Sequence, residues 1–264
     1  MCGITGFLGG DCTNTTLNES TLLDMADQLL TRGPDSSGIW LDESAKIGLA
    51  HKRLAIVDLS AAGHQPMSSG SDRYVITYNG EIYNSSEIRH DLTSARLHPK
   101  WRGHSDTETL LAAFDVWGIK ETITRVKGMF AIAVWDKECE ELSLVRDRIG
   151  EKPLYYGWQG SGSKRTFLFG SELKALKRHS SFTNDIDRAS LALYMRYCYV
   201  PTPHSIYEGI KKLEPGTILT ISLKQNSCRS EKYWDALDVV TKGAKDPFNE
   251  SKIEITNNLD TVLK

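Results

Sequence analysis

Hydrophobic and polar positions alternate over short stretches through most of the chain, and only a few stretches repeat at helical spacing. Short apolar runs bounded by Gly, Pro, Asn or Asp predict β-strands, at 2–9, 37–41, 46–51, 73–78, 81–83, 129–136, 142–146 and 217–223. Apolar residues three and four apart predict helices, near 22–30 and at 85–92, 105–117 and 188–199. Many short strands with few helices favour an α+β fold with mainly antiparallel sheets over alternating βαβ units.

Two local signals refine this pattern. Asn79-Gly80 stands between two strand-like runs and is the strongest short hairpin signal in the chain. The run Ser105-Asp106-Thr107-Glu108 has the spacing of a capping box, so it predicts the start of a helix.

The pattern changes towards the end of the chain. Residues 235–249 are polar and predict a linker. Four apolar residues then mark one face of a final helix, namely Ile255, Leu259, Val262 and Leu263. A helix with one apolar face needs a surface to pack on. We therefore expect one domain at 2–235, and at 236–264 a linker and the first helix of a further domain.

Composition and charge narrow the function. The 264 residues include 32 Lys and Arg against 34 Asp and Glu, a net charge of −2, whereas nucleic-acid binders usually carry a basic excess. Neither a signal peptide nor an apolar run of about 18 residues is present, so we expect no membrane association. The seven histidines show no metal-ligand spacing. Five cysteines without a C-x-x-C motif argue against a disulfide framework or zinc site and favour a cytoplasmic protein; they are Cys2, Cys12, Cys139, Cys198 and Cys228.

Cys2 stands directly behind the initiator methionine. Methionine is normally removed when the second residue is small, and Cys2 would then carry a free α-amine. An α-amine titrates at about 7.7–8.0, so it can act as a general base for the thiol of the same residue. Cys2 is therefore a candidate N-terminal nucleophile, and the alternative is a small buried residue with no chemical role. We interpret the other four cysteines as structural.

Four further residues are candidates for catalysis or substrate binding, and each also has a simpler explanation. Asn79 and the Gly80 N–H could form a two-donor oxyanion hole, or only a hairpin turn. Arg53 lies among apolar strand residues, where it could bind a carboxylate in bidentate fashion or reach out to solvent. Asp106 falls in the first turn of a helix, whose dipole would keep it ionised and able to bind an ammonium; the alternative is simple stabilisation of the dipole.

Together these residues fit the two charges of a free amino acid. Arg53 would bind the α-carboxylate, Glu81 and Asp106 the α-ammonium, and Cys2 would face a side-chain amide. The implied substrate is L-glutamine.

The chain resembles the glutaminase half of glutamine-dependent asparagine synthetases, which are class II amidotransferases of the N-terminal-nucleophile hydrolase superfamily. The resemblance runs from Met1 to about Trp234. It is carried by MCGITGF (1–7), RGPDSSG (32–38), AHKRLAIVDLS (50–60), GHQPM (63–67), YNGEIYN (78–84), HSDTE (104–108), KGMFAIAVWD (127–136), RDRIGEKPLYYG (146–157), SELKAL (171–176) and YVPTPHSIYEGIKKLEPG (199–216).

The resemblance implies a four-layer αββα sandwich of two antiparallel sheets between helices. It also implies Cys2 as nucleophile, Asn79 and Gly80 as the oxyanion hole, and a set of glutamine-binding residues made up of Arg53, Glu81 and Asp106, with main-chain groups around Leu54, Ile56 and Val57. The segment 146–157 resembles a stretch near the junction with the second half of the family's enzymes; the alternative is a plain surface loop.

The second half of those enzymes is an ATP-pyrophosphatase domain with an SGGxDS loop, which does not occur in this sequence. We therefore expect no cofactor in this chain, with ATP and Mg²⁺ needed only by that further domain. The expected partners are L-glutamine and a synthetase domain in cis, with a homodimer as one candidate assembly. Aspartate is the expected acceptor of the ammonia. A sugar acceptor in surface-polysaccharide synthesis and a truncated remnant without turnover stay open as alternatives.

Overall fold

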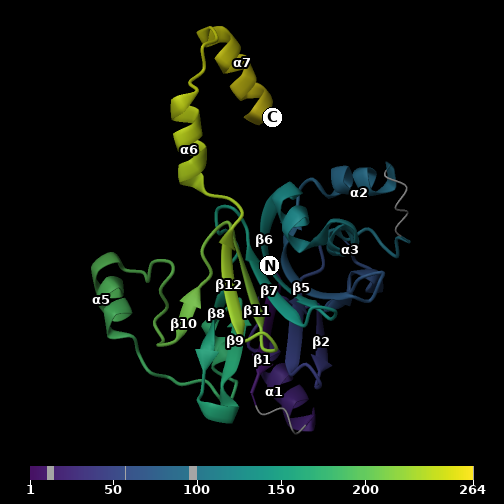
Figure 1. The fold of residues 1–264 in the computed structure, drawn as a ribbon, viewed down its shortest axis with the longest axis vertical. Helices are drawn as coiled ribbons and strands as arrows, with labels where there is room; N and C mark the ends of the chain where they lie inside the picture. Colours follow the sequence, from purple (N-terminus) through teal and green to yellow (C-terminus); the bar gives the residue numbers. More distant parts are fainter. Residues whose placement is uncertain (11–14, 57, 95–99, 264) are drawn as a thin grey trace.

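The computed structural model describes residues 1–10, 15–56, 58–94 and 100–263. Within these ranges the strands form two antiparallel six-stranded sheets (Figure 1). The first sheet has the order β10-β8-β9-β1-β3-β2, with bounds Ile210–Lys212, Tyr155–Gln159, Thr166–Gly170, Gly3–Gly9, Ile47–Arg53 and Ser36–Asp42. The second has the order β12-β11-β7-β6-β5-β4, with bounds Ser227–Lys232, Thr217–Ser222, Glu141–Arg146, Gly128–Asp136, Tyr74–Ile82 and Met67–Ser68.

Helices cover the outer faces of the two sheets. Helices α1 (Thr15–Asp27) and α4 (Leu173–Leu176) pack on the first sheet, and α2 (Ser85–Ser94) and α3 (Asp106–Arg125) pack on the second. Three apolar clusters fill the spaces between the layers, and the middle one joins inward-facing residues of both sheets, such as Leu49, Phe169, Ala133 and Leu144. This confirms the predicted four-layer αββα arrangement.

Strand β1 is buried along its whole length and pairs with β3 on one side and β9 on the other. Glycine is needed where neighbours approach the strand closely: a Cβ at Gly6 would lie 2.3 Å from the carbonyl oxygen of Gly48. Because β1 is an interior strand, its position is set on both sides. The residue before it, Cys2, is therefore held at the end of the sheet.

The predicted hairpin at Asn79-Gly80 is wrong. Strand β5 runs without a turn from Tyr74 to Ile82 and pairs along its length with β6. Gly80 serves close approach instead of turning, because a Cβ there would meet the Met129 carbonyl oxygen at 2.2 Å.

The helix predicted at 105–117 begins as expected and continues further. Ser105 caps α3 by accepting a hydrogen bond from the Glu108 N–H at 3.3 Å. The capping box is only half formed, because the Glu108 carboxylate accepts from the Arg102 and Gly103 N–H groups at 2.6 and 3.0 Å. Beyond Trp117 the helix passes a kink at Gly118, which has a φ of 76°.

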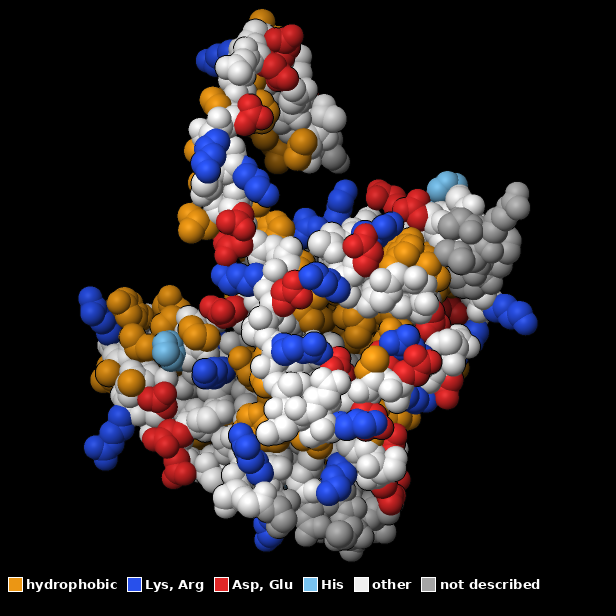
Figure 2. Space-filling model, viewed as in Figure 1, with side chains coloured by type: hydrophobic (Ala, Val, Ile, Leu, Met, Phe, Trp, Pro, Cys, Tyr) orange, Lys and Arg blue, Asp and Glu red, His pale blue; other side chains and the backbone are white. Residues whose placement is uncertain are grey.

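The polar linker predicted at 235–249 is wrong in part, because 236–245 is helical. Helix α6 (Ala236–Lys245) is capped by Asp235, and α7 (Lys252–Leu263) follows it. Both extend away from the sheets and bury none of their described residues (Figure 1). Apolar side chains are visible along them, and further ones on α5 (Arg188–Tyr197) (Figure 2). None of the described helices is both long and apolar enough to cross a membrane.

Candidate active site

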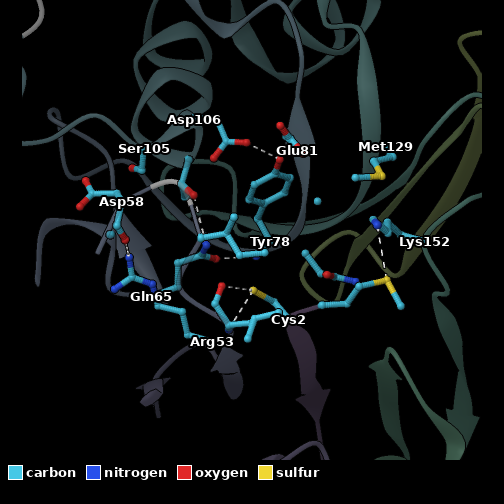
Figure 3. A pocket seen from close by; sticks show the side chains of 17 residues that line it. Cys2, Arg53, Asp58, Gln65, Tyr78, Glu81, Ser105, Asp106, Met129 and Lys152 are labelled. Atoms are coloured by element: carbon cyan, nitrogen blue, oxygen red, sulfur yellow. Dashed lines mark hydrogen bonds between the residues drawn. The ribbon is translucent and has the colours of Figure 1, made fainter. Parts of the chain in front are cut away.

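One small cleft of about 130 Å³ collects most of the residues named from the sequence. It lies where the start of β1, the end of β3, the middle of β5 and the start of α3 meet (Figure 3). Its lining includes eight of the nine predicted site residues: Cys2, Arg53, Leu54, Ile56, Asn79, Gly80, Glu81 and Asp106. The ninth, Val57, lies outside the described residues.

The Cys2 thiol is half-buried and contacts both main-chain groups of Leu54. The Leu54 N–H donates to Sγ at 3.4 Å, and Sγ lies 3.6 Å from the Leu54 carbonyl oxygen. The Cys2 carbonyl accepts from Arg32 Nε at 2.9 Å, and Arg32 in turn pairs with Glu172 at 3.1 Å. The thiol thus lies against the main chain of Leu54 at the edge of the cleft.

Asn79 presents an unused donor to the cleft. Its side chain is only 2% exposed, and Nδ2 has no hydrogen-bond partner. Buried polar atoms are nearly always paired, so an unpaired amide that lines a cleft points to a ligand.

Gly80 offers a second donor for a different reason. Its partner across the strand pair is Phe130, whose N–H and C=O both bond to Asp147, at 3.2 and 2.9 Å. In an antiparallel pair this makes Gly80 a non-hydrogen-bonded position, with its N–H on the side away from β6. The N–H groups on either side of it on that edge are occupied, Tyr78 by Gln65 Oε1 at 2.7 Å and Ile82 by Asp106 Oδ2 at 3.0 Å. The Gly80 N–H therefore faces the cleft between two occupied donors.

Arg53 ends β3 and is half-buried. Its guanidinium does not simply reach out to solvent. It donates to the carbonyl oxygens of Asp58 and Ser60, the latter at 3.0 Å. Gly63 allows this placement, because a Cβ at Gly63 would lie 2.1 Å from Arg53 Nη2. The surrounding loop thus fixes the cation at one end of the cleft.

Asp106 and Glu81 place two carboxylates at the same cleft. Asp106 Oδ2 accepts from the Tyr78 hydroxyl at 2.6 Å and from the Ile82 N–H at 3.0 Å. Burial raises the pKa of Asp106 above its ordinary value, and Glu81 adds to the rise, while these two hydrogen bonds oppose it. Burial thus opposes the ionised form that the helix dipole is expected to favour. A bound ammonium between the two carboxylates would favour their charged forms.

Several cleft residues were not predicted from the sequence. Gln65 is 6% exposed and joins β5 to α3, because its Nε2 donates to Thr107 Oγ1 at 3.1 Å while its Oε1 accepts from Tyr78. Lys152 and Met129 line the cleft beside Met1. All of them lie within stretches that carry the resemblance, yet nothing in their residue types alone marks them as site residues.

The segment 146–157 is not a plain surface loop. The Asp147 carboxylate is fully buried and accepts from five backbone N–H groups, those of Phe130 and residues 149–152. Arg146 donates to the carbonyl oxygens of Lys152, Gly150 and Leu213 at 2.6–2.8 Å. The segment is thus anchored by buried hydrogen bonds, and its residue Lys152 lines the cleft.

The other described cysteines, Cys139, Cys198 and Cys228, are free and exposed, and Cys12 lies outside the described residues. Cys198 ends α5 in the left-handed conformation, with a φ of 61°. Among the residues described, no group of three or more His, Cys, Asp or Glu side chains could hold a metal ion.

Comparisons with known proteins agree on one family for this chain. A family model described as a glutamine amidotransferase domain matches residues 1–234. The chain is 37% identical over 261 residues to asparagine synthetase [glutamine-hydrolyzing] 3 of Bacillus subtilis, covering 95% of this chain and 41% of that protein. It is 32% identical over 258 residues to a putative asparagine synthetase of Methanocaldococcus jannaschii, covering 90% and 47%. It is also 30% identical over 264 residues to amidase chry2 of Gibberella zeae, covering 96% and 37%.

The chain spans less than half the length of each of these relatives. Among solved structures, glutamine phosphoribosylpyrophosphate amidotransferase of B. subtilis superposes with a TM-score of 0.60 at 19% identity, over 88% of this chain and 49% of that one. An allosteric regulatory enzyme of purine biosynthesis gives 0.62, with the same identity and coverage. These similarities concern the fold alone.

Proposed function

Because the chain belongs to the family of class II glutamine amidotransferase domains related to asparagine synthetases, we propose that it hydrolyses L-glutamine to glutamate and ammonia, with Cys2 as nucleophile. The observation that carries this proposal is the pair of open donors, Asn79 Nδ2 and the Gly80 N–H, at the cleft that holds the Cys2 thiol. Two such donors can stabilise the oxyanion that forms when a thiolate attacks an amide carbonyl.

The charged side chains that line the cleft would bind the substrate. Arg53 would bind the α-carboxylate, and Asp106 with Glu81 the α-ammonium, while main-chain groups near Leu54 and Ile56 line the path between them. Val57 belongs to the same proposed set. Binding both charges fixes the position of the side-chain amide, so only an amino acid of the right length would bring its amide carbon to Sγ.

The reaction would use the α-amine that Met1 removal creates on Cys2. The amine takes the thiol proton, Sγ bonds to the δ-carbon of glutamine, and the carbonyl π electrons move to the oxyanion. When the C–N bond breaks, the amine returns the proton to the leaving nitrogen as ammonia. Water then attacks the γ-glutamyl thioester, the S–C bond breaks, and glutamate leaves with the thiol regenerated.

For the acceptor of the ammonia, we propose aspartate, amidated with ATP and Mg²⁺ by a synthetase domain beyond this chain. Support comes from the asparagine synthetases among its relatives. A second candidate is amidation of another acceptor, such as a sugar; the relative named amidase chry2 shows that not all relatives are named asparagine synthetases. Turnover of glutamine is common to both candidates.

The test is release of glutamate and ammonia from glutamine by the purified chain, with mass spectrometry of its N-terminus to show whether Met1 has been removed. We expect turnover in the processed wild type and a loss of at least about 10³-fold in Cys2→Ala. A processed, folded wild type without turnover would overturn the proposal. Asparagine formation from aspartate and ATP would be measured in a protein that also carries the synthetase domain.

A further inference from the structure

Lys152 is a buried cation with almost no partner. Its side chain lines the cleft, and the residue is only 6% exposed. The contact made by Nζ is with the Met1 sulfur at 3.5 Å (Figure 3), and within the described ranges no carboxylate lies within ion-pair distance. A thioether is a weak acceptor, and a buried ammonium is costly without a counter-charge. Such an arrangement points to a role in the site.

The placement of Lys152 is enforced by its backbone. Its N–H donates to Asp147 Oδ2 at 3.0 Å, and its carbonyl accepts from Arg146 Nε at 2.8 Å. Both clamping side chains are buried. The same Asp147 also binds Phe130 opposite Gly80. One buried carboxylate therefore fixes both the open N–H of Gly80 and the position of the lysine.

The lysine lies close to the atom that becomes the general base. A methionine side chain keeps its sulfur within about 5 Å of its own carbonyl carbon, which is bonded to the Cys2 nitrogen, so Nζ lies within about 10 Å of that nitrogen. When Met1 leaves, Nζ loses its contact and the Cys2 nitrogen becomes a free amine.

We propose that Lys152 is a positioning residue whose positive charge keeps the Cys2 α-amine in its neutral, proton-accepting form once Met1 is removed. This inference rests on the proposed function. A nearby cation disfavours a second positive charge, so the amine would stay unprotonated to lower pH than it would without the lysine. At a separation of about 10 Å between Nζ and the Cys2 nitrogen, the lysine charge would lower the pH at which the amine is half protonated by about one unit.

The other cations near Cys2 have contacts of their own. Arg32 holds the Cys2 carbonyl from the segment after α1 and pairs with Glu172 at the start of α4 at 3.1 Å. Arg53 at the end of β3 donates to loop carbonyl oxygens, and the α-carboxylate of the substrate would neutralise its charge.

The carboxylates near the cleft have other hydrogen-bond partners or face the proposed substrate, and none of those described pairs with Lys152. Asp58 accepts from Ser60 and from the His104 N–H. Asp106 of α3 accepts from Tyr78 of β5, and with Glu81 it would face the substrate ammonium. Two titratable neighbours stay neutral: burial lowers the pKa of His51 to about 3 and raises the pKa of Tyr78 well above its ordinary value. Lys152 is therefore a charge near the new amine that neither a described carboxylate nor the bound substrate would compensate.

The test titrates the N-terminal amine directly in the Met1-processed chain. Acylation of the α-amine by acetic anhydride would be measured from about pH 5 to about pH 9 by mass spectrometry of the N-terminal peptide. The variants are Lys152→Met, which removes the charge at similar volume, Lys152→Arg, which keeps it, and Lys211→Met, the same exchange at the exposed position of strand β10. Thermal unfolding would show that each variant is folded; if Lys152→Met does not fold, Lys152→Gln takes its place.

We expect Lys152→Met to raise the acylation midpoint by about one pH unit, with Lys152→Arg and Lys211→Met close to wild type. The acid limb of kcat/KM for glutamine should move by the same amount. Unchanged midpoints in the folded Lys152 variants would overturn the inference while leaving the proposed function standing. If Lys152→Met shifts the acylation midpoint but the processed wild type releases no glutamate, the proposed function alone is overturned.

Discussion

Because the Asn79 amide is unpaired, we predict that Asn79→Ala lowers kcat strongly and changes the stability of the fold little. In Asn79→Ala the oxyanion loses one of its two proposed donors, which typically lowers kcat by about 10²–10³-fold. KM for glutamine should change little, because the charged ends of the substrate are bound by Arg53, Glu81 and Asp106. The fold should tolerate the change, because Nδ2 makes no hydrogen bond that could be lost.

The stability side can be estimated from the structure. Leaving a buried donor unpaired costs about 1–3 kcal/mol, so its removal offsets much of the packing lost with the side chain. We therefore expect the free energy of unfolding of Asn79→Ala to lie within about 1 kcal/mol of wild type.

Asn84 provides a matched control five residues further along. It lies outside the cleft, and its side chain makes two hydrogen bonds to backbone, with Arg125 at 3.1 Å and Lys127 at 2.8 Å. Asn84→Ala should therefore lower stability by about 1–2 kcal/mol and leave kcat near wild type.

Steady-state glutamate release gives kcat and KM, and urea unfolding followed by circular dichroism gives the free energy of unfolding. The reasoning would be refuted if Asn79→Ala kept full kcat, or if it lost as much stability as Asn84→Ala while kcat fell only in proportion to the unfolded fraction.

Two further predictions concern buried titratable groups. Asp147→Asn puts a donor amide among five backbone N–H donors, so urea unfolding should show a loss of about 2–4 kcal/mol, and a change below about 0.5 kcal/mol would contradict the hydrogen-bond assignment. For His51 burial lowers the pKa from 6.5 to about 3, so the unfolded chain binds a proton that the folded chain does not. The contribution of neutral His51 to stability is complete above pH 6.5 and is lost as the pH falls towards 3. The free energy of unfolding, measured across that window, should therefore decline less steeply in His51→Gln than in wild type. Equal slopes would show that the histidine is protonated in the folded state.

Much of the sheet structure could be predicted because the relevant patterns are local. The hairpin of β6 and β7 and the pairing of β2 with β3 follow from alternating apolar residues on either side of short polar turns. The resemblance to a known family then supplied the layer order, which the structure confirms. Together with the chemistry of the residue types, it named eight of the 17 residues that line the cleft.

The failures have a common physical cause, because the same residue type serves a local and a long-range purpose. Asn79-Gly80 carries a turn signal, but the glycine is required by the close approach of β6 at Met129. The contacts of Asp147 and the clamped backbone of Lys152 lie mostly within the turn 146–152, with Phe130 as a distant partner, and the residue types alone do not mark them. Helix α6 was missed because the polar composition of 235–249 outweighed the helical spacing of Leu237 and Val240, whose side chains stay exposed.

The identity of the nucleophile is the central claim, and a trapped intermediate tests it most directly. The Met1-processed chain would be mixed with glutamine, quenched in acid during turnover, digested, and its N-terminal peptide analysed by mass spectrometry. The account predicts a γ-glutamyl adduct on Cys2 that disappears on treatment with hydroxylamine and is absent from Cys2→Ala, which should also release no glutamate above background. Glutamate release by Cys2→Ala at the wild-type rate would contradict it.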